Sequence, residues 1–354
     1  MEELYTLERE VGRGSYGVVF EGHMAKTGQR VAIKRLPCSN PECIELYLQE
    51  LWAMRATAKN HVNVIALHSC LLQTGPRSLK RLKPGKLPVR LVESVLKGRV
   101  VGSNSQIRTN TASRLKDRTN TQPEPLRCLA LWLVMEYCDG GDLNQYLLSR
   151  PPDAQRNHSV VQQLCRAVDF LHNLGITHRD LKPDNVLVCV TPKGPVVKVA
   201  DFGLSKMTEG VAGSDLTRQH FSSTCGSDFY MAPEVWGGLS YTAQADIFSL
   251  GVMFWAVLER ITLLEEGTTQ EQLGAYVCKG RSGWLIPLGE ALWENSDLQL
   301  CIPMKFRRAP PLPPPPGPAM CTLLLDMLAS SPDVRPSADQ LEARVRSALK
   351  EDSH

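Results

Sequence analysis

The residue types best suited to chemistry gather in one short stretch, His178-Arg179-Asp180-Leu181-Lys182-Pro183-Asp184-Asn185. Asp180 can accept a proton, Lys182 adds a positive charge, and Asn185 supplies a neutral oxygen ligand five residues beyond the aspartate. Together these groups suit the movement of an anionic group under a metal ion. A solvated turn after a helix could hold the same residues, so the flanking segments must decide between the two interpretations.

A glycine-rich segment lies near the N-terminus, at Gly12-Arg13-Gly14-Ser15-Tyr16-Gly17-Val18-Val19-Phe20. Apolar and β-branched residues on both sides predict strand, glycine turn and strand. Glycines let backbone N–H groups come close to phosphate oxygens, because no Cβ stands in the way. Dinucleotide-binding folds use the same glycine spacing, but there a helix follows the glycines. Here a second strand follows, which favours a hairpin that covers phosphates.

A lysine ends the next apolar strand, Val31-Ala32-Ile33-Lys34, about 17 residues after the last of these glycines. The strand and its lysine point to a nucleoside triphosphate, and an ordinary hairpin with a surface lysine is the alternative. Residues 42–54 have helical periodicity and include Glu45 and Glu50. If Lys34 binds phosphates it needs a carboxylate partner, and Glu50 is the better placed by motif.

The segments before the His178 stretch predict a hinge and a helix. Residues 131–137 have strand character and end at Cys138-Asp139-Gly140-Gly141-Asp142, a linker that precedes a helix beginning near Leu143. A strand that ends in a glycine-containing linker suits a hinge between two lobes. Residues 160–174 predict an amphipathic helix that ends at Gly175.

The segments after this stretch bring a second acid toward the first. Two apolar strands, residues 186–188 and 196–200, lead into Asp201-Phe202-Gly203, about 20 residues after Asp180. One aspartate that takes a proton and another that holds a metal, on adjacent hairpins, is an arrangement that such chemistry needs. The spacing therefore favours a functional site over a solvated turn.

Composition limits the remaining possibilities. The chain has 354 residues, of which 43% are hydrophobic and 22% charged, and this is ordinary for a soluble globular protein. A net charge of +3 is too small to argue for nucleic acid. Eleven cysteines without a Cys-x-x-Cys pair favour reduced, intracellular thiols. The N-terminus shows no secretory signal, and the longest apolar segment, residues 247–258, is too short for a membrane span and predicts a buried helix.

Two segments depart from globular composition. Residues 74–126 are rich in Lys and Arg, and we expect a long, partly disordered insertion there, with Lys80-Arg81-Leu82-Lys83-Pro84-Gly85-Lys86 as a nuclear-import patch, a patch for acidic partners or a solubilising charge run. Residues 309–318 are proline-rich and predict an extended polyproline segment. The spacing of Arg307, Pro310 and Pro313 fits an SH3 ligand, and a stiff connector without a partner is the alternative.

In order, these motifs and a later Ala232-Pro233-Glu234 resemble the eukaryotic protein kinases. The resemblance implies an α+β, bilobal kinase fold over residues 1–349. Its small β-rich N-lobe, residues 1–137, would carry one regulatory helix and the insertion. Its larger, mainly helical C-lobe would span residues 138–349. The implied substrates are ATP and protein hydroxyls, with Mg²⁺ as cofactor.

The resemblance implies roles residue by residue. Asp180 would be the catalytic base, Lys182 would support the moving phosphoryl group, and Lys34 would bind the α- and β-phosphates and pair with Glu50. Two residues, Asn185 and Asp201, would hold Mg²⁺. The nucleotide-binding residues implied are Val11, Gly12, Arg13, Gly14, Ser15, Tyr16, Gly17, Val18, Val19, Ala32, Lys34, Glu50, Met135, Glu136, Cys138, Asp142 and Leu187.

Within that set the family pattern assigns each residue a part of the nucleotide. Backbone groups of Glu136 and Cys138 would bind adenine, Met135 would be the gatekeeper, and Asp142 would lie near the ribose. The adenine ring would be sandwiched by Val19, Ala32 and Leu187.

Other residues resemble the regulatory and structural parts of a kinase. Lys182 and Ser227 resemble the serine/threonine rather than the tyrosine enzymes, and Arg179 would receive a phosphate placed on Ser223, with Ser222 and Thr224 beside it. Glu234 and Arg335 resemble a buried ion pair. Asp246 resembles a helix carboxylate that braces the catalytic loop.

Four phrases resemble the Clik group, the kinases named for binding a PDZ-LIM protein: Val11-Gly12-Arg13-Gly14-Ser15-Tyr16-Gly17, Cys138-Asp139-Gly140-Gly141-Asp142, Asp228-Phe229-Tyr230-Met231-Ala232-Pro233-Glu234 and Leu258-Glu259-Arg260-Ile261-Thr262. This likeness implies a nuclear location, with the cytoplasm as the alternative, and actin-linked partners.

Two other functions compete with catalysis. A kinase-fold scaffold could act through the basic insertion and the proline-rich segment, but Lys34, Asp180 and Asp201 are all present, whereas pseudokinases usually lack one of them. A nucleic-acid binder is disfavoured, because the basic run lacks the interleaved aromatic residues of a stacking platform.

Overall fold

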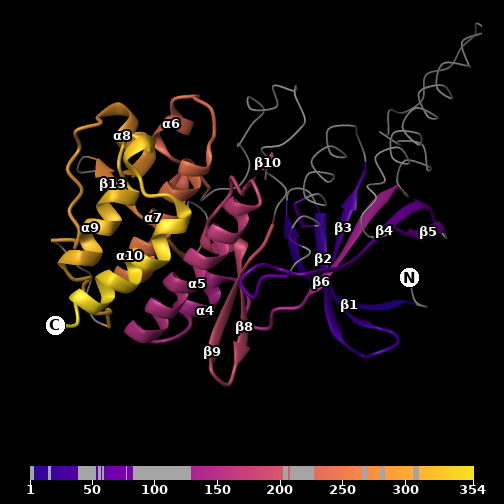
Figure 1. The fold of residues 1–354 in the computed structure, drawn as a ribbon. Coiled ribbons are helices and arrows are strands. Elements are labelled where there is room, and N and C mark those ends of the chain that lie inside the picture. The colour runs from indigo at the N-terminus through magenta and orange to yellow at the C-terminus, as the bar shows by residue number, and fades with distance from the viewer. Residues whose placement is uncertain are drawn as a thin grey trace, which may run out of the picture. The chain divides into compact units, whose positions relative to one another are not determined.

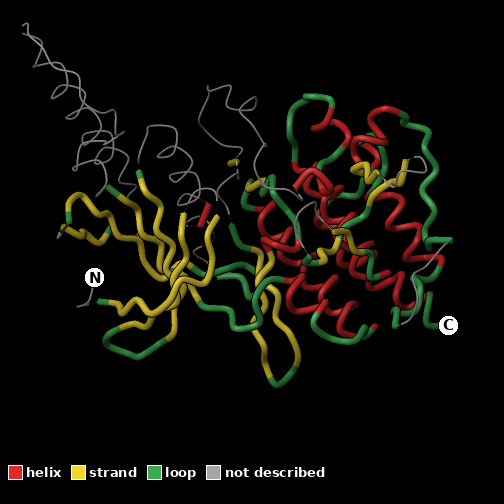
Figure 2. Tube along the Cα trace, turned by 180° about the vertical axis from the view of Figure 1, so that it is seen from behind, coloured by secondary structure: helices red, strands yellow, loops and turns green. Residues whose placement is uncertain are grey.

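The chain is seen in a computed structural model, which describes residues 4–14, 17–38, 53–54, 57, 60–76, 78–82, 129–201, 206–207, 227–264, 269–279, 284–305 and 311–354. Its contacts divide into two compact units. The first comprises Met1–Arg55 with Leu67–Tyr137, and the second comprises Ala56–Ala66 with Cys138–His354. The first unit is built on a sheet and the second is mainly helical (Figures 1 and 2), so the predicted α+β fold class is confirmed.

Within the described residues, six antiparallel strands form the sheet of the first unit, in the order β1-β2-β3-β6-β4-β5. Their bounds are β1 Tyr5–Gly14, β2 Gly17–Met24, β3 Arg30–Pro37, β4 Leu67–Gly75, β5 Ser78–Arg81 and β6 Ala130–Glu136. The predicted hairpin at the glycines and the predicted strands at residues 31–34 and 131–137 are confirmed. Of the predicted helix over residues 42–54, only Ala53–Met54 are described, and both are helical and buried.

One face of this sheet packs as a core because side chains alternate along a strand. On β3, Val31 and Ile33 point into this core, while Ala32 and Lys34 point to the other face. The buried core residues are Tyr5, Val31, Ile33, Leu71, Ala130, Trp132 and Val134.

The predicted insertion begins with ordered strand. Residues 78–81 form β5, which pairs with β4 from Leu71↔Arg81 to Gly75↔Ser78. Composition placed the start of the insertion at residue 74, because Lys80 and Arg81 are residues common in loops. In the structure both are exposed side chains of a strand. Residues 83–126 of the predicted insertion lie outside the described residues.

The second unit contains the helices α4 Leu143–Leu148, α5 Ala154–Asn173, α6 Pro233–Trp236, α7 Ala243–Glu259, α8 Leu288–Glu294, α9 Pro318–Met327 and α10 Ala338–Glu351. Its short strands are β7 Ile176–Thr177, β8 Val186–Thr191, β9 Gly194–Val199, β10 Lys206–Met207, β11 Thr262–Leu264, β12 Glu271–Leu273, β13 Tyr276–Lys279 and β14 Trp284–Pro287. Its described residues also form the 3₁₀ turns η1 Pro183–Asn185, η3 Ser227–Tyr230 and η4 Pro332–Val334. Among the described helices, none is long and apolar enough to cross a bilayer.

Helix α7 is the centre of this unit. Every residue from Ala245 to Glu259 is buried, and the helix packs against α5 and α9. This confirms the buried helix predicted over residues 247–258. Helix α5 begins six residues before the predicted start, because Asp153 accepts a hydrogen bond from the backbone N–H of Arg156 (2.8 Å) and caps it.

The helical unit contains a buried ion pair between Glu234 and Arg335. The guanidinium of Arg335 donates to both carboxylate oxygens of Glu234, at 2.7 and 2.8 Å. It also donates to the backbone carbonyls of Ala329, Gln244 and Ser330. This bidentate geometry confirms the pair expected from the resemblance, and it ties α6 to the segment before α10.

The described part of the proline-rich segment, residues 311–317, is neither helix nor strand and leads into α9, which begins at Pro318. Pro313 is buried, so it is covered by the rest of the chain at a position that an SH3 domain would need to contact. The carboxylate of Asp352 caps α9 by accepting from the backbone N–H groups of Ala319 and Met320, both at 3.0 Å. These contacts favour the stiff connector. Arg307 and Pro310 lie outside the described residues.

Replacing Arg335 by alanine should lower the free energy of unfolding by about 3–5 kcal/mol, because Glu234 would remain buried and uncompensated. The matched control is Arg344→Ala, which removes an exposed pair with Asp326 and should cost about 0–1 kcal/mol. Urea unfolding of both variants measures the difference. Equal losses would show that burial of the Arg335 pair does not matter.

Candidate active site

The loop that contains Asp180 is held by one buried carboxylate on α7. Asp246, whose side chain is almost wholly buried, accepts the backbone N–H of His178 at 2.8 Å and that of Arg179 at 3.0 Å. Its two oxygens also bind the ring of His172 (2.9 Å) and the hydroxyl of Tyr241 (2.9 Å). Four donors on one carboxylate fix the loop backbone relative to the central helix.

The charge of Asp246 is stabilised in spite of its burial. Burial on its own raises the pKa of a carboxyl group, because the charged form loses its hydration. Here the hydrogen bond and charge of His172 and the N–H of Arg179 outweigh burial and lower the pKa of Asp246. The carboxylate is therefore an ionised anchor.

Two residues of the site have backbone angles that are rare for side-chain-bearing residues. Arg179 has φ of 72° and Asp201 has φ of 59°, both in the left-handed region. Such conformations cost free energy and persist where the surroundings impose them. For Arg179 the imposing contact is the bond from its N–H to Asp246.

His178 links the loop to the strand that leads to Asp201. Its Nε2 binds the carbonyl of Ala200 at 2.8 Å, and its Nδ1 accepts the N–H of Asp180 at 3.2 Å. A carbonyl can only accept, so the two bonds require the proton on Nε2. The imidazole therefore positions both aspartates of the predicted site from one buried ring.

The Asp180 carboxylate lies between Asn185 and Lys182. The amide nitrogen of Asn185 donates to the carbonyl of Asp180 (2.7 Å) and to its Oδ2 (3.0 Å). The ammonium of Lys182 lies 3.9 Å from Oδ1. Because the nitrogen of Asn185 donates both of these bonds, its amide oxygen is the atom of this side chain suited to a cation.

The electrostatics of the loop centre on Lys182. Burial raises the pKa of Asp180, the charge of Asp201 adds to this, and the charge of Lys182 and the hydrogen bond from Asn185 oppose it. Burial also raises the pKa of Asp184 and of Asp228, and Lys182 opposes both shifts. The buried lysine is therefore surrounded by three carboxyl groups.

The sequence did not indicate two residues near Lys182, Asn144 and Asp228. Asn144 on α4 donates to Asp184 and accepts the backbone N–H of Leu273 at 2.8 Å. An asparagine in the first turn of a short helix gives no signal of such a role. Asp228 is 46 residues after Lys182 in the chain, so its closeness to that lysine depends on tertiary structure.

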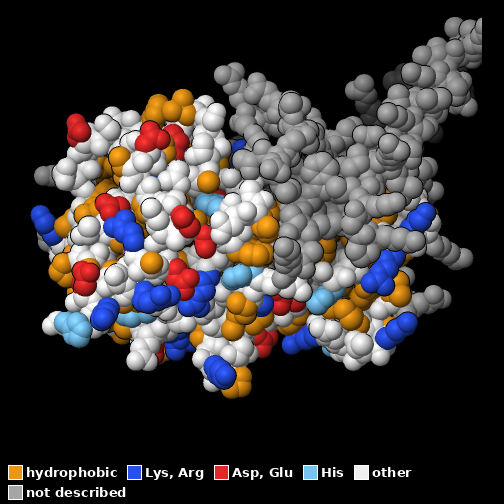
Figure 3. Space-filling model, viewed as in Figure 1, with side chains coloured by type: hydrophobic (Ala, Val, Ile, Leu, Met, Phe, Trp, Pro, Cys, Tyr) orange, Lys and Arg blue, Asp and Glu red, His pale blue; other side chains and the backbone are white. Residues whose placement is uncertain are grey.

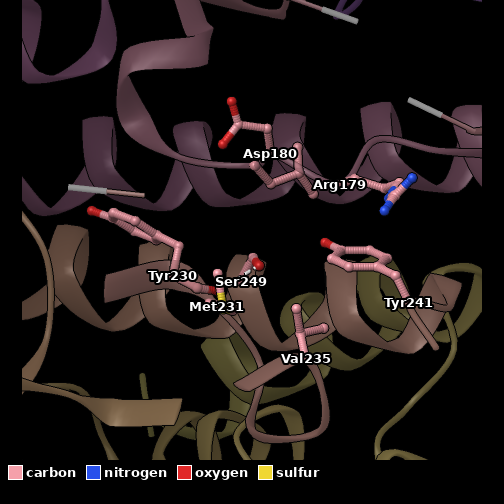
Figure 4. Close-up of a pocket in the computed structure, with 8 residues that line it drawn as sticks. Arg179, Asp180, Tyr230, Met231, Val235, Tyr241 and Ser249 are labelled. Carbon is pink, nitrogen blue, oxygen red and sulfur yellow. Dashed lines mark hydrogen bonds between the residues drawn. The ribbon is translucent and has the colours of Figure 1, made fainter. Parts of the chain in front are cut away.

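A small cavity lies beneath the loop, on the side away from the Asp180 carboxylate. It measures about 20 Å³ and is lined by Arg179, Asp180, Leu181, Tyr230, Met231, Val235, Tyr241 and Ser249. Figure 4 shows the Asp180 carboxylate directed away from Tyr230 and Ser249, with the guanidinium of Arg179 above the Tyr241 ring. This volume suits one water molecule, so the cavity belongs to the loop's support.

In the first unit, four predicted nucleotide-binding residues share one face of the sheet. Val19 lies opposite Lys34, Ala32 lies opposite Met135, and Ala32 and Lys34 are two residues apart. By strand alternation all four side chains point to the face opposite Val31 and Ile33. The sheet therefore brings Val19 and Ala32, two of the residues predicted to contact adenine, onto the same face as Lys34, which is predicted to bind the phosphates. Val18 points to the other face.

The glycines of the first hairpin differ in the space that surrounds them. A Cβ on Gly17 would lie 2.5 Å from the carbonyl of Arg35, so this glycine is required by packing. A Cβ on Gly12 would meet no described atom within 4 Å, which leaves open space over the hairpin. Arg13 pairs with Glu10 at 2.9 Å, and Val11 is exposed. Ser15 and Tyr16 lie outside the described residues.

The predicted adenine and ribose residues of the second unit also lie close together. Asp142 and Leu187 form an antiparallel bridge. Asp142 has a structural role as well, because it caps α4 by accepting the N–H of Gln145 at 2.9 Å. Burial raises the pKa of Asp142 to about 6, and the charge of Asp184 adds to this, while backbone N–H groups of Gln145 and Asn144 oppose it.

Several predicted residues cannot be placed. Glu50, the partner expected for Lys34, lies outside the described residues, as do Ser222, Ser223 and Thr224. Glu136 ends β6 and lies opposite Val31. Of the described residues, no three His, Cys, Asp or Glu side chains gather as a metal site.

Replacing Asp246 by asparagine should lower the free energy of unfolding by roughly 3 kcal/mol at pH 7, because bonds to a charged acceptor are lost. The folded pKa of Asp246 lies below its ordinary value of 3.8. The carboxylate therefore stabilises the fold fully above about pH 4, and this contribution is lost as the pH falls through the folded pKa.

The difference between wild type and Asp246→Asn should thus stay constant from pH 7 to about pH 4 and shrink below it. Urea unfolding at a series of pH values measures this difference, with Asp333→Asn, an exposed aspartate on η4, as the control. A difference that already disappears between pH 7 and pH 5 would contradict the assignment of Asp246 as an ionised anchor.

Comparison with known proteins agrees with this geometry. Residues 126–345 match the family described as Protein kinase domain, and residues 5–93 match that described as Protein tyrosine and serine/threonine kinase. A probable myosin light chain kinase of Dictyostelium discoideum is 28% identical over 261 residues, 73% of this chain and 57% of that protein.

Serine/threonine-protein kinase atg1 of Dictyostelium discoideum is 25% identical over 260 residues, 72% of this chain and 30% of that protein. Serine/threonine-protein kinase 33 of Mus musculus is 28% identical over 314 residues, 86% of this chain and 52% of that protein. The chain thus spans between 30% and 57% of the length of these three relatives. Since the match over residues 126–345 covers more than half of the 354 residues, the chain belongs to the protein kinase family.

Proposed function

We propose that the chain is a serine/threonine protein kinase, which transfers the γ-phosphoryl group of ATP to protein hydroxyls. The observation that carries the proposal is the environment of Asp180, whose carboxylate lies between the amide of Asn185 and the ammonium of Lys182. Burial raises the pKa of this carboxyl group, which makes the ionised form a better proton acceptor.

Each charged group of the loop has a proposed role. Asp180 accepts the proton of the substrate hydroxyl, and Lys182 neutralises charge on the phosphoryl group as it moves. Phosphoryl transfer has a loose transition state, so positioning and charge neutralisation supply most of the catalysis. The anchoring of the loop by Asp246 supports this role, because a fixed backbone keeps both side chains in register.

The residues present fit Mg²⁺. The amide oxygen of Asn185 is the atom of that side chain suited to a cation, because its nitrogen donates to Asp180. Asp201 is exposed, and its charge raises the pKa of Asp180. Two protein ligands are typical for Mg²⁺ at nucleotide sites, where phosphates and water complete the octahedron. When bound there, Mg²⁺ would neutralise charge on the phosphate oxygens.

The first unit fits the nucleotide in the same way. Val19, Ala32, Lys34 and Met135 share the sheet face opposite the core residues Val31 and Ile33, and a Cβ on Gly12 would meet no described atom within 4 Å. We propose that adenine lies against the apolar members of this face and that Lys34 binds the α- and β-phosphates. Glu50 remains the proposed partner of Lys34.

The chain should phosphorylate serine and threonine residues, and not tyrosine, on a peptide array with Mg²⁺ and ATP. Asp180→Asn should lower the rate by about 10²–10⁴-fold, the usual contribution of a general base, with ATP affinity retained. Asp333→Asn serves as the matched control, because Asp333 is exposed and distant in sequence from the loop. Mass spectrometry of the phosphopeptides gives the readout.

If Asp180→Asn phosphorylates the array as fast as wild type, the catalytic proposal fails. The scaffold function would then remain, acting through the basic insertion and the proline-rich segment. The face drawn in Figure 3 gives little support to a role in nucleic-acid binding. On the face drawn in Figure 3, Lys and Arg side chains lie among Asp and Glu side chains rather than in one continuous patch.

At the level of the subfamily we propose membership of the Clik group, supported by the four phrases named above. Membership implies a PDZ-LIM protein as partner and a nuclear location. Calorimetric titration with a purified PDZ-LIM protein should show saturable binding. A complex of this kind should have a Kd of about 1 μM. A titration that shows no heat change up to about 100 μM, which is about 100 times this Kd, would contradict the proposal.

A further inference from the structure

Two cysteines lie side by side in the second unit although they are far apart in the chain. Cys189 on β8 donates through its thiol to the sulfur of Cys138, and the two sulfurs are 3.1 Å apart. This distance is about 1 Å longer than a disulfide bond, which measures about 2.05 Å. Both residues are thiols in this structure, and both are partly exposed to solvent.

The backbone holds these two sulfurs at this distance. The N–H of Gly140 donates to the carbonyl of Val188 at 2.7 Å, and the N–H of Val188 donates to the carbonyl of Gly141 at 2.9 Å. The N–H of Val190 donates to the carboxylate of Asp139 at 2.8 Å. These bonds lie on both sides of Cys189, so the segment after Cys138 is fastened to β8 before any sulfur chemistry occurs.

A glycine makes this close approach possible. A Cβ on Gly140 would lie 2.7 Å from the carbonyl oxygen of Val188, closer than real Cβ atoms are found. The two segments therefore run in contact only because residue 140 has no side chain. Closing the remaining 1 Å between the sulfurs takes rotation of the two cysteine side chains and a small movement of Cys138 toward β8.

We propose that Cys138 and Cys189 form a redox modification site, which a peroxide converts reversibly into a disulfide. One thiolate attacks the O–O bond of hydrogen peroxide, so that an S–O bond forms and hydroxide leaves. The other thiolate attacks that sulfur, the S–S bond forms, and a second hydroxide leaves. With the two thiol protons this gives two molecules of water. The sulfurs are oxidised and the peroxide is reduced, and a dithiol reductant reverses the reaction.

The disulfide has a consequence that rests on the proposed function. Leu187, two residues before Cys189, and the backbone of Cys138 are proposed to contact adenine. Drawing the sulfurs together moves Cys138 toward β8 and away from the position that an adenine contact requires. Oxidation should therefore weaken nucleotide binding several-fold, and reduction should restore it.

The test treats the full purified chain with hydrogen peroxide, blocks the remaining thiols, and maps disulfides by mass spectrometry under non-reducing conditions. A linked peptide pair with Cys138 and Cys189, lighter by two hydrogens and split by dithiothreitol, is expected. Cys189→Ser and Cys138→Ser should each abolish this species. Cys301→Ser, which removes an exposed thiol elsewhere, should form it as wild type does.

Recovery of Cys189 as a thiol or as a sulfinic acid, under conditions that oxidise Cys301, would overturn the proposal. A second measurement compares the affinity of a fluorescent ATP analogue for the reduced and the oxidised chain. Equal affinities, with the disulfide mapped, would overturn the effect on nucleotide binding. A reduced chain that binds no nucleotide would instead be a failure of the proposed kinase function, and the mapping result would stand apart from it.

Discussion

The hydrogen bonds from the loop backbone to Asp246 are the interaction on which the candidate site depends. A buried carboxylate is costly unless donors surround it. Here two backbone N–H groups, an imidazole and a phenol hydroxyl supply those donors. One of these bonds holds the backbone of Arg179 in a left-handed conformation. The buried helix α7 therefore fixes the backbone conformation of the loop.

This arrangement separates support from chemistry. The groups that hold the loop, Asp246, His172 and Tyr241, lie beneath it. Asp180 points away from the cavity on that side and lies against Asn185 and Lys182 (Figure 4). His178 joins the two sides, because one ring nitrogen binds the loop and the other binds the strand that ends before Asp201. Support and reactive groups can therefore be changed independently by mutation.

Much of the fold follows from local pattern. The apolar run at residues 31–33, which ends in Lys34, predicts a strand, and the longer apolar run at residues 247–258 predicts a buried helix. The motifs also indicate the loop residues of the site. What pattern cannot supply is register and tertiary contact. The packing reason for Gly17 and the burial of Pro313 each depend on residues distant in sequence. The closeness of Cys138 to Cys189 likewise depends on how two segments pair.

The most direct test of this account is amide hydrogen exchange at His178 and Arg179 in the wild-type chain. If the Asp246 carboxylate holds the loop, the two N–H groups open only when the helical unit unfolds. Their opening free energy should then equal that of amides in the middle of α7 and fall equally with added urea. Exchange at the rate of an exposed turn, independent of urea, would contradict the claim that this carboxylate fixes the loop.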